Sequence, residues 1–472
     1  DAVAEKAFNI GMGPFALMNL TGPAIALHAT NYLSEQLNCP RYSGAKSLRE
    51  TIENSGMWEI GQDTECDEET AKIIRERLLG QVFAVSAQIV EEEICSIEDV
   101  DRGAKVGLRW AEGPFEIANK IGITEATRMA ESYAELAQFE LPQWMKEKNE
   151  KFEFNYIDID INGKIAKIKL NRPEAMNALN ESVVEQLGLA LDKLNSRNDI
   201  DTIILEGAGK AFVAGADVKF FVDKIHEDAI KDIYDFTAYG HEVLNKLEKS
   251  EKTTIALTTG LALGGGLELA LSCDYRIGTR RSQFRFPETS IGIFPGLGGT
   301  QRTPRICGIE AARYAILAGN FLDSGTASAL GIITHLVEPS EITKTIIKIS
   351  AEGKPTNKYP AKPKERNHPV SLFAVKFYKN ENMEEILSGK VPTGFDSEDK
   401  MVSRQMKSLS FAAPIALNIA NQLLDGATST EGDLEAGLKM ELAELNTIFT
   451  SKDALEGLSA LIEGRRPKYI NS

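Results

Sequence analysis

The order of hydrophobic and polar positions divides the chain into parts with different periodicity. From residue 1 to about 148, apolar positions recur at the spacing of helices, which predicts an almost entirely helical domain. Within it, Gly11–Gly22 recurs as Trp110–Gly122, and in each copy a Gly-Pro pair ends one helix and begins the next. The sequence therefore predicts a duplicated helical unit. The charged, glycine-free residues 149–153 predict a linker after it.

Alternation of apolar and polar residues begins at residue 154, where a strand pair is predicted around the turn Asn162-Gly163. A helical pattern over Glu181–Leu194 and an apolar strand at Asp201–Glu206 follow. Strand, helix and strand in succession predict an α/β domain over 154–338, with its functional loops after the strand ends.

The remaining residues, 339–472, have a looser pattern. Lys354–Lys364 is rich in proline and lysine and poor in apolar residues, which predicts an extended surface connection. Four later segments have helical spacing and predict a cover over the core: Glu384–Leu387, Met401–Leu409, Pro414–Leu424 and Leu434–Phe449.

Composition narrows the functional classes. The 472 residues are 43% hydrophobic and 26% charged, as in globular proteins, and the net charge of −16 argues against a nucleic-acid partner. Five cysteines and five histidines are scattered without the spacing of metal ligands, so we expect no metal and a reducing, cytoplasmic compartment. Because Asp1 leads directly into what resembles the interior of a helix, we expect the chain to be part of a longer polypeptide.

One apolar stretch contains three consecutive glycines and a carboxylate. Thr259–Asp274 predicts a strand that ends at Gly264–Gly266 and opens a helix, whose first amides have no intrahelical partner and can hold negative charge. Glu268 lies in the first helical turn between two leucines, where an acid is costly unless it has a function. A capping acid that interacts with the helix dipole is the alternative. The glycines and the glutamate argue against a membrane span.

Three further stretches add small residues, another acid and a second glycine turn. Ala211–Lys219 offers a second exposed amide, at Ala216, and Phe286-Pro287-Glu288 provides a second carboxylate. Gly292–Arg302 predicts a glycine-rich turn into a helix.

These four stretches, together with Arg172–Leu179, resemble the crotonase (enoyl-CoA hydratase) superfamily over roughly Tyr156–Val337 and the extreme C-terminus. The resemblance implies a crotonase-like ββα superhelix. The duplicated helical unit resembles the C-terminal domain of 3-hydroxyacyl-CoA dehydrogenases. The Rossmann domain that binds NAD and carries the catalytic His-Glu pair in that family has no counterpart here, so dehydrogenation by this chain is not expected. The whole resembles a bifunctional hydratase/dehydrogenase that lacks its Rossmann domain.

The resemblance implies reversible hydration of a short, crotonyl-sized trans-2-enoyl-CoA, with the CoA thioester as substrate and no required cofactor. The amides of Ala216 and Gly265 are expected to hold the negative charge that develops on the thioester oxygen. Glu268 is assigned as the base that takes a proton from water and Glu288 as the acid that delivers one to C2, although two acids sharing a site can exchange roles. The residues expected to contact the substrate are Ala175, Ala214, Asp217, Val218, Lys219, Gly264, Pro287 and Gly296.

The sequence departs from the family at the C-terminus, and alternatives stay open. Leu461 and Gly464 stand where hydratases commonly present Phe and Lys to CoA, and Arg465 or Arg466 could substitute. Double-bond isomerisation and thioester hydrolysis are alternative activities of the same fold, but the presence of both acids favours hydration. The N-terminal domain could also serve as an assembly module only. By analogy with the family, a homo-oligomer is expected, either a trimer or a dimer of trimers.

Overall fold

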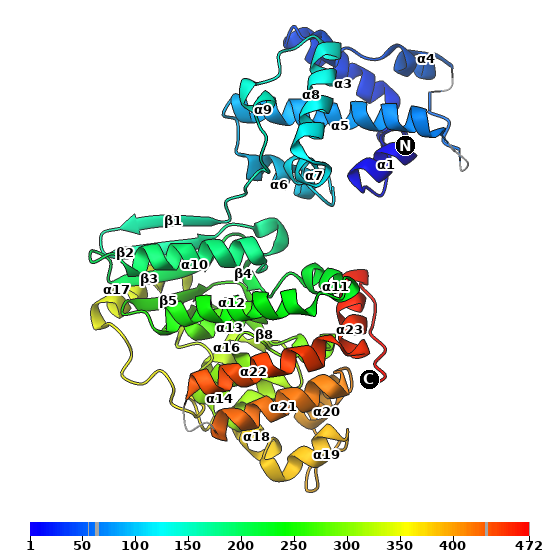
Figure 1. The fold of residues 1–472 in the computed structure, drawn as a ribbon. Helices are drawn as coiled ribbons and strands as arrows, with labels where there is room; N and C mark the ends of the chain where they lie inside the picture. Colours follow the sequence, from blue (N-terminus) through cyan, green and yellow to red (C-terminus); the bar gives the residue numbers. More distant parts are fainter. Residues whose placement is uncertain (55, 62–65, 430–432, 472) are drawn as a thin grey trace. The chain divides into compact units, whose positions relative to one another are not determined.

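The structure is a computed structural model that describes residues 1–54, 56–61, 66–429 and 433–471. Contacts along the chain divide it into two units, Asp1–Phe154 and Asn155–Ser472 (Figure 1).

Helices make up all of the regular structure in the described part of the first unit. They are α1 (Ala2–Phe8), α2 (Pro14–Thr21), α3 (Pro23–Gln36), α4 (Lys46–Asn54), α5 (Glu68–Glu91), α6 (Ile97–Gly107), α7 (Pro114–Ile121), α8 (Ile123–Ala137) and α9 (Gln143–Lys146), with a 3-10 turn η1 (Pro40–Tyr42). The predicted helical character of this part of the chain is confirmed.

The two copies of the repeat share hydrogen bonds as well as sequence. Asp1 accepts hydrogen bonds from the first amides of α2, and Asp101 accepts them from the first amides of α7. Asn19 and Asn119 each exchange two hydrogen bonds with the backbone of an aromatic residue later in the chain. The aspartate and the asparagine each recur 100 residues later, which agrees with the predicted duplication.

The second copy of the repeat is the better buried one. Helix α5 packs closely on α8, because Gly80 has no side chain: a Cβ there would lie 2.3 Å from the carbonyl oxygen of Met129. Phe115 is buried in this core, whereas Phe15 at the matching position of the first copy is 40% exposed. Residues 149–153, expected to be a linker, are anchored on the same core by the buried ring of Phe152.

Two sheets form the centre of the second unit. The six-stranded sheet has the order β1-β2-β3-β5-β7-β10, antiparallel between β1 and β2 and parallel elsewhere, and the four-stranded sheet has the order β4-β6-β8-β9. The predicted hairpin turns at Gly163 with φ of 58°, which favours glycine. The strands are β1 (Ile157–Asn162), β2 (Ile165–Leu170), β3 (Thr202–Gly207), β4 (Ala211–Ala214), β5 (Thr253–Thr258), β6 (Leu261–Leu263), β7 (Tyr275–Gly278), β8 (Gln283–Arg285), β9 (Leu322–Asp323) and β10 (His335–Leu336).

The register of the smaller sheet brings three loops to one edge. Strand β6 pairs in parallel with β4 and β8, and Leu263 lies opposite both Ala214 and Arg285. Parallel strands end at the same edge of a sheet, and ligands in such folds bind outside their carboxyl ends. The loops after β4, β6 and β8 therefore emerge together.

Helices surround the sheets and form the C-terminal cover (Figure 1). They are α10 (Glu181–Asn195), α11 (Val218–His226), α12 (Ile230–Glu248), α13 (Gly265–Ser272), α14 (Gly299–Cys307), α15 (Ile309–Ile316), α16 (Ser324–Leu330), α17 (Ile342–Glu352), α18 (Pro369–Phe377), α19 (Met383–Leu387), α20 (Lys400–Leu409), α21 (Pro414–Ser429), α22 (Leu434–Phe449) and α23 (Lys452–Glu463). Short 3-10 turns are η2 (Pro173–Ala175), η3 (Glu288–Ile291), η4 (Pro339–Glu341) and η5 (Asn380–Asn382). The four predicted cover helices correspond to α19 to α22.

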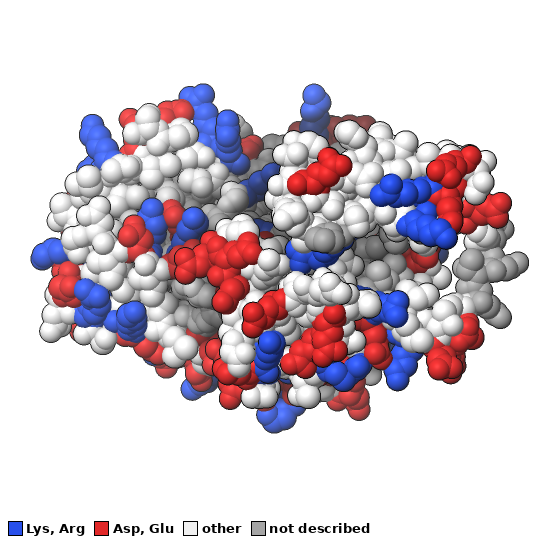
Figure 2. Space-filling view, turned by 90° about the horizontal axis from the view of Figure 1, so that it is seen from above, with Lys and Arg blue, Asp and Glu red and all other residues white. Residues whose placement is uncertain are grey.

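The surface mixes both signs of charge. Figure 2 shows acidic and basic side chains interspersed over the face that it presents. The described side chains on that face form no stripe of positive charge of the kind that tracks a nucleic-acid backbone. Among the described residues, no helix combines the length and the hydropathy needed to cross a membrane.

Candidate active site

Glu268 is presented by the glycine turn between β6 and α13. Strand β6 ends at Leu263, and Gly264 takes φ of 48° and ψ of −124°, a conformation that disfavours other residues. Helix α13 starts at Gly265 as predicted, so Glu268 lies in its first turn. Its side chain is 1% exposed.

The carboxylate of Glu268 is fixed by a second backbone loop. Its Oε1 atom accepts hydrogen bonds from the amides of Leu297, at 2.8 Å, and Gly299, at 2.7 Å. A Cβ on Gly299 would lie 2.7 Å from the same oxygen, so glycine is needed there for the carboxylate to approach. The predicted glycine-rich turn at 292–302 therefore binds the carboxylate of Glu268, and the turn at Gly264–Gly266 places that residue in the first turn of α13.

Glu288 faces the same space from η3. A Cβ built on Gly264 would lie 2.4 Å from its Oε1 atom, which places this carboxyl group against the turn that leads to Glu268. The Oε2 atom of Glu288 is buried and has no hydrogen-bond partner among the described residues. A buried polar atom without a partner costs about 1–3 kcal/mol and points to a role beyond stability.

Both carboxyl groups hold their protons more tightly than usual. Burial raises the pKa of Glu288 to about 8, against smaller opposite effects of its own amide and of Arg285. Burial raises the pKa of Glu268 well above its usual range, and the negative charges of Glu288 and Glu441 raise it further. Two nearby acids with raised pKa values can hold one proton between them at neutral pH, which suits proton transfer.

The two predicted backbone donors lie side by side. A Cβ on Gly265 would lie 3.8 Å from the nitrogen of Ala216. Leu179 bonds the backbone on both sides of Ala216, through Gly215 and Asp217, and the amide between them has no acceptor among the described residues. The amide of Gly265 belongs to the first helical turn and also lacks an intrahelical acceptor. Both amides are therefore available to an acceptor in the cavity that the two residues line.

One cavity of about 460 Å³ collects most of the predicted residues. It is lined by Ala214, Ala216, Val218, Gly264, Gly265, Glu268, Pro287, Glu288 and Gly296, all of which the sequence had suggested. Ala175, Asp217 and Lys219 are not among its lining residues. Asp217 caps α11 and pairs with Arg172 at 3.3 Å, and the side chain of Lys219 is exposed.

The C-terminal cover completes the cavity wall. Leu445 and Phe449 of α22 line the buried part, and Phe449 stacks on Phe221 with ring centres 5.2 Å apart. Leu461 and Arg465, near the end of α23, line the cavity where side chains are exposed, so they mark its mouth. Sequence reasoning missed the two α22 residues. Their signal was the apolar stripe of α22, which is equally typical of ordinary core packing.

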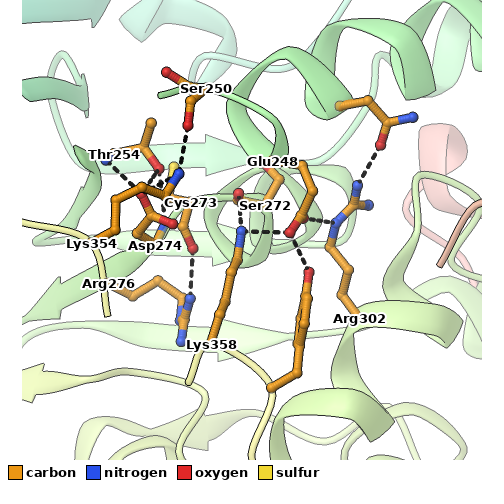
Figure 3. A network of polar contacts seen from close by, with 12 residues as sticks. Glu248, Ser250, Thr254, Ser272, Cys273, Asp274, Arg276, Arg302, Lys354 and Lys358 are labelled. Carbon is orange, nitrogen blue, oxygen red and sulfur yellow. Dashed lines mark hydrogen bonds and ion pairs between the residues drawn. The ribbon is translucent and has the colours of Figure 1, made fainter. Parts of the chain in front are cut away.

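The segment Lys354–Lys364 contains no helix or strand, as predicted, yet its side chains are not all solvated. Figure 3 shows Lys358 and Arg302 meeting at Glu248, at 2.8 and 3.0 Å. Lys358 also donates to the carbonyl oxygen of Ser272, the last residue of α13. Burial would raise the pKa of Glu248, but the two cations outweigh it and lower the pKa. The segment thus fastens the far end of the helix that carries Glu268.

Comparisons with known proteins agree with this architecture. The family described as enoyl-CoA hydratase/isomerase matches residues 165–471, and the C-terminal domain of 3-hydroxyacyl-CoA dehydrogenase matches residues 74–158. Solved structures of a carnitinyl-CoA dehydratase from Mycobacterium thermoresistibile and an enoyl-CoA hydratase from Rhodobacter sphaeroides share the fold. Their TM-scores are 0.58 and 0.57 and their identities 20% and 21%, and each alignment covers 67% of this chain and 92% of the solved chain.

Curated relatives are similar over the second unit. The short-chain-enoyl-CoA hydratase of Clostridium acetobutylicum is 37% identical over 199 residues, which is 42% of this chain and 75% of the relative. The crotonyl-CoA hydratase of Syntrophomonas wolfei is 37% identical over 188 residues, 40% of this chain and 71% of the relative. The mitochondrial methylglutaconyl-CoA hydratase of Mus musculus is 30% identical over 306 residues, 65% and 79% of the two chains. With its N-terminal dehydrogenase-type helical domain and its two-acid cavity, this chain belongs to the enoyl-CoA hydratase/isomerase family.

Proposed function

We propose that this protein catalyses the reversible hydration of short-chain trans-2-enoyl-CoA thioesters to 3-hydroxyacyl-CoA. The observation that carries the proposal is one cavity lined by two buried acids, Glu268 and Glu288, and by the paired backbone of Ala216 and Gly265. The relatives named for hydration of short enoyl-CoA and crotonyl-CoA support the same reaction and substrate size.

Water adds across the C2=C3 bond in the forward direction. The water oxygen bonds to C3 while Glu268 takes one of its protons, and the π electrons move toward the thioester oxygen as an enolate. The electrons return when Glu288 delivers a proton to C2, so the two acids together neither gain nor lose a proton. The amides of Ala216 and Gly265 stabilise the enolate, each by roughly 3–4 kcal/mol. The two acids can exchange their parts in this scheme.

This scheme uses the CoA thioester and water and needs no nicotinamide. Dehydrogenation of the product needs a hydride acceptor, which Rossmann domains bind. The part of this chain that matches 3-hydroxyacyl-CoA dehydrogenase is the C-terminal domain of that family. We therefore expect no dehydrogenation by this chain. For the CoA moiety, Arg465 at the cavity mouth is a candidate for a phosphate contact. A bidentate pair with Glu456 holds its guanidinium. Lys219 and Asp217 stay as candidates on the resemblance alone.

The two acids distinguish hydration from the other activities of the fold. Moving a double bond within the acyl chain needs one group that carries a proton between carbons, and hydrolysis of the thioester needs attack at C1. Addition of water to C3 needs one group to activate water and one to protonate C2. The pair formed by Glu268 and Glu288 meets that need.

An assay with crotonyl-CoA tests the proposal. Loss of the enoyl thioester absorbance should accompany formation of 3-hydroxybutyryl-CoA, without NAD and without release of free CoA. Glu268→Gln and Glu288→Gln should each lower kcat by about 10²–10⁴-fold with little change in KM, while the exposed Glu435→Gln should leave both unchanged. Wild-type protein that leaves crotonyl-CoA and longer enoyl-CoAs unaltered would refute the proposal, and free CoA as the product would replace it with hydrolysis.

Assembly is proposed on the resemblance, and location on the cysteine content. We expect a homo-oligomer, a trimer or a dimer of trimers, and a cytoplasmic location in keeping with five free cysteines. Mass measurement in solution, with and without residues 1–148, tests whether the helical domain contributes to assembly.

A further inference from the structure

We propose that Glu441, supported by His241, is a positioning residue that aligns the carboxylate of Glu268 for hydration. The inference rests on the proposed function for its catalytic meaning. Its geometry stands independently of that function.

Four consecutive amides alternate between two buried carboxylates. The amides of residues 297 and 299 donate to Glu268, whereas the amides of residues 298 and 300 donate to Glu441, at 2.7 and 3.1 Å. The hydroxyl of Thr300 donates to Glu441 as well. The loop is therefore held between the two acids, one on each side of its backbone.

The position of this backbone decides where Glu268 can point. The loop enters the N-terminus of α14 at Gly299, where free amides and the helix dipole favour negative charge. Gly298 has φ of 98°, so the chain can turn the alternate amides to opposite sides. If Glu441 no longer accepts from the amides of residues 298 and 300, the loop loses contacts that orient the amides of residues 297 and 299 toward Glu268.

Burying the carboxylate of Glu441 costs desolvation free energy, which suggests that this residue has a role in positioning the loop. It is 0% exposed on α22, on the same face as the apolar Leu438 and Leu445. A buried carboxylate is tolerated when several donors meet it, and here all of the described backbone donors come from the loop.

His241 of α12 holds the other end of the loop. Its Nε2 atom lies 2.6 Å from the carbonyl oxygen of Gly296 and 3.4 Å from Glu441. Because a carbonyl can only accept, Nε2 carries the proton and donates it. The Nδ1 atom is buried without a partner among the described residues. One imidazole therefore joins Glu441 to the stretch that lines the cavity at Gly296.

Glu441 also acts through its charge. Its negative charge raises the pKa of Glu268, after the larger effects of burial and of Glu288. The charged or titratable groups around Glu268 are Glu288 of η3 and Glu441 of α22, with His241 of α12, Arg302 of α14 and Arg285 of β8 one contact further away. Removing the charge of Glu441 should therefore lower the pKa of Glu268.

The test compares Glu441→Gln with Glu441→Asp and with the control Glu435→Gln on the exposed side of the same helix. In Glu441→Gln an NH₂ group replaces one carboxylate oxygen and faces a backbone amide, and both groups are donors. The side chain therefore loses one acceptor as well as its negative charge. We expect kcat to fall by at least about 10-fold with KM nearly unchanged, and the acidic limb of the kcat profile to move to lower pH. Glu441→Asp should restore the position of that limb because it restores the charge. Equal kcat and an unmoved limb in folded Glu441→Gln would overturn the proposal.

A second measurement does not depend on turnover. The infrared band of protonated buried carboxyl groups, assigned with Glu268→Gln, reports the titration of Glu268 directly. It should titrate at lower pH in Glu441→Gln than in wild type. If Glu268 titrates identically in both proteins, Glu441 only caps the helix α14, and the proposal fails even if hydration is observed. If the titration shifts but no hydration is observed, the proposed function is refuted and the contact between Glu441 and the loop still positions Glu268. If Glu441→Gln does not fold, His241→Gln provides the same comparison of kcat against KM.

Discussion

Arg302 donates from Nη1 to the carbonyl oxygen of Leu297, 3.1 Å away. The amide of Leu297 donates in turn to Glu268, so the guanidinium fixes a peptide that orients the proposed base. Glu248 and Asn245 hold the other nitrogens of Arg302.

Loss of Lys358 should weaken this support. Lys358→Met removes one cation from the partly buried Glu248 and one donor from the end of α13. We expect the free energy of unfolding to fall by about 1–3 kcal/mol and kcat to fall with it, whereas Lys362→Met, an exposed change in the same segment, should alter stability by less than about 0.5 kcal/mol. Chemical denaturation measures both, and equal stabilities would contradict the supporting role.

The rate of hydration should decline in alkaline solution. Glu288 has its pKa raised to about 8, so its proton is present below that pH and is lost above it. We expect kcat/KM for crotonyl-CoA to fall as the pH rises past about 8, because the acid that protonates C2 is then ionised. The limb should be absent in the residual activity of Glu288→Gln. A wild-type profile that stays flat well above pH 8 would speak against this acid.

A methyl group at Gly264 should disturb the site more than the fold. Gly264→Ala places a Cβ 2.4 Å from Glu288, and Gly389→Ala places one in open space, although both positions have positive φ. Each variant should lose about 1–3 kcal/mol of stability from backbone strain, but only Gly264→Ala should lose most of its hydratase activity. Parallel thermal unfolding and crotonyl-CoA assays distinguish the two effects, and equal activities would show that the contact is unimportant.

Phe449 should limit the length of the acyl chain. It stacks on Phe221 in the buried wall of the cavity, away from the exposed mouth at Leu461. Phe449→Ala should raise kcat/KM for 2-octenoyl-CoA relative to crotonyl-CoA by about 10-fold, while Phe411→Ala, at a half-exposed position outside the cavity, should leave the ratio unchanged. A ratio that Phe449→Ala does not alter would place the end of the acyl chain elsewhere.

Asp101 should make the helical domain sensitive to pH. Burial raises its pKa to about 7, from about 3.9 in an unfolded chain. Its contribution to stability is therefore complete below the unfolded value and is lost as the pH rises toward 7. Relative to wild type, Asp101→Asn should gain on the order of 2 kcal/mol between about pH 4 and pH 7, measured by urea unfolding. Asp99→Asn, at an exposed position, should show no such trend.

Local chemistry made much of the site predictable. The glycine turn before Glu268, the second acid and the small residues around Ala216 are each set by neighbours in the chain, because turns and helix starts depend on a few adjacent residues. The roles assigned to these residues stay predictions until the assays above are made. The hairpin at Gly163 and the duplicated helices were predictable for the same reason.

Contacts between distant segments were not predictable in this way. Glu441 accepts hydrogen bonds from residues 141 and 143 positions earlier, which no periodicity reveals. Its one local signal was an acid placed on the apolar stripe of α22. Lys358 lies in a stretch whose composition predicts solvation, but its long side chain reaches back to Glu248. The presence of a charged residue in a sequence does not show whether the fold gives it an ion-pair partner away from solvent.

The distance along the chain between the loop and Glu441 has a consequence for synthesis. A ribosome makes both acids of the cavity, and the glycine turn that faces them, well before it makes α22. Until that helix emerges, the amides of Gly298 and Thr300 have no carboxylate to receive them. The nascent protein therefore contains both acids and the glycine turn before it contains the helix whose carboxylate receives two of the amides of that turn.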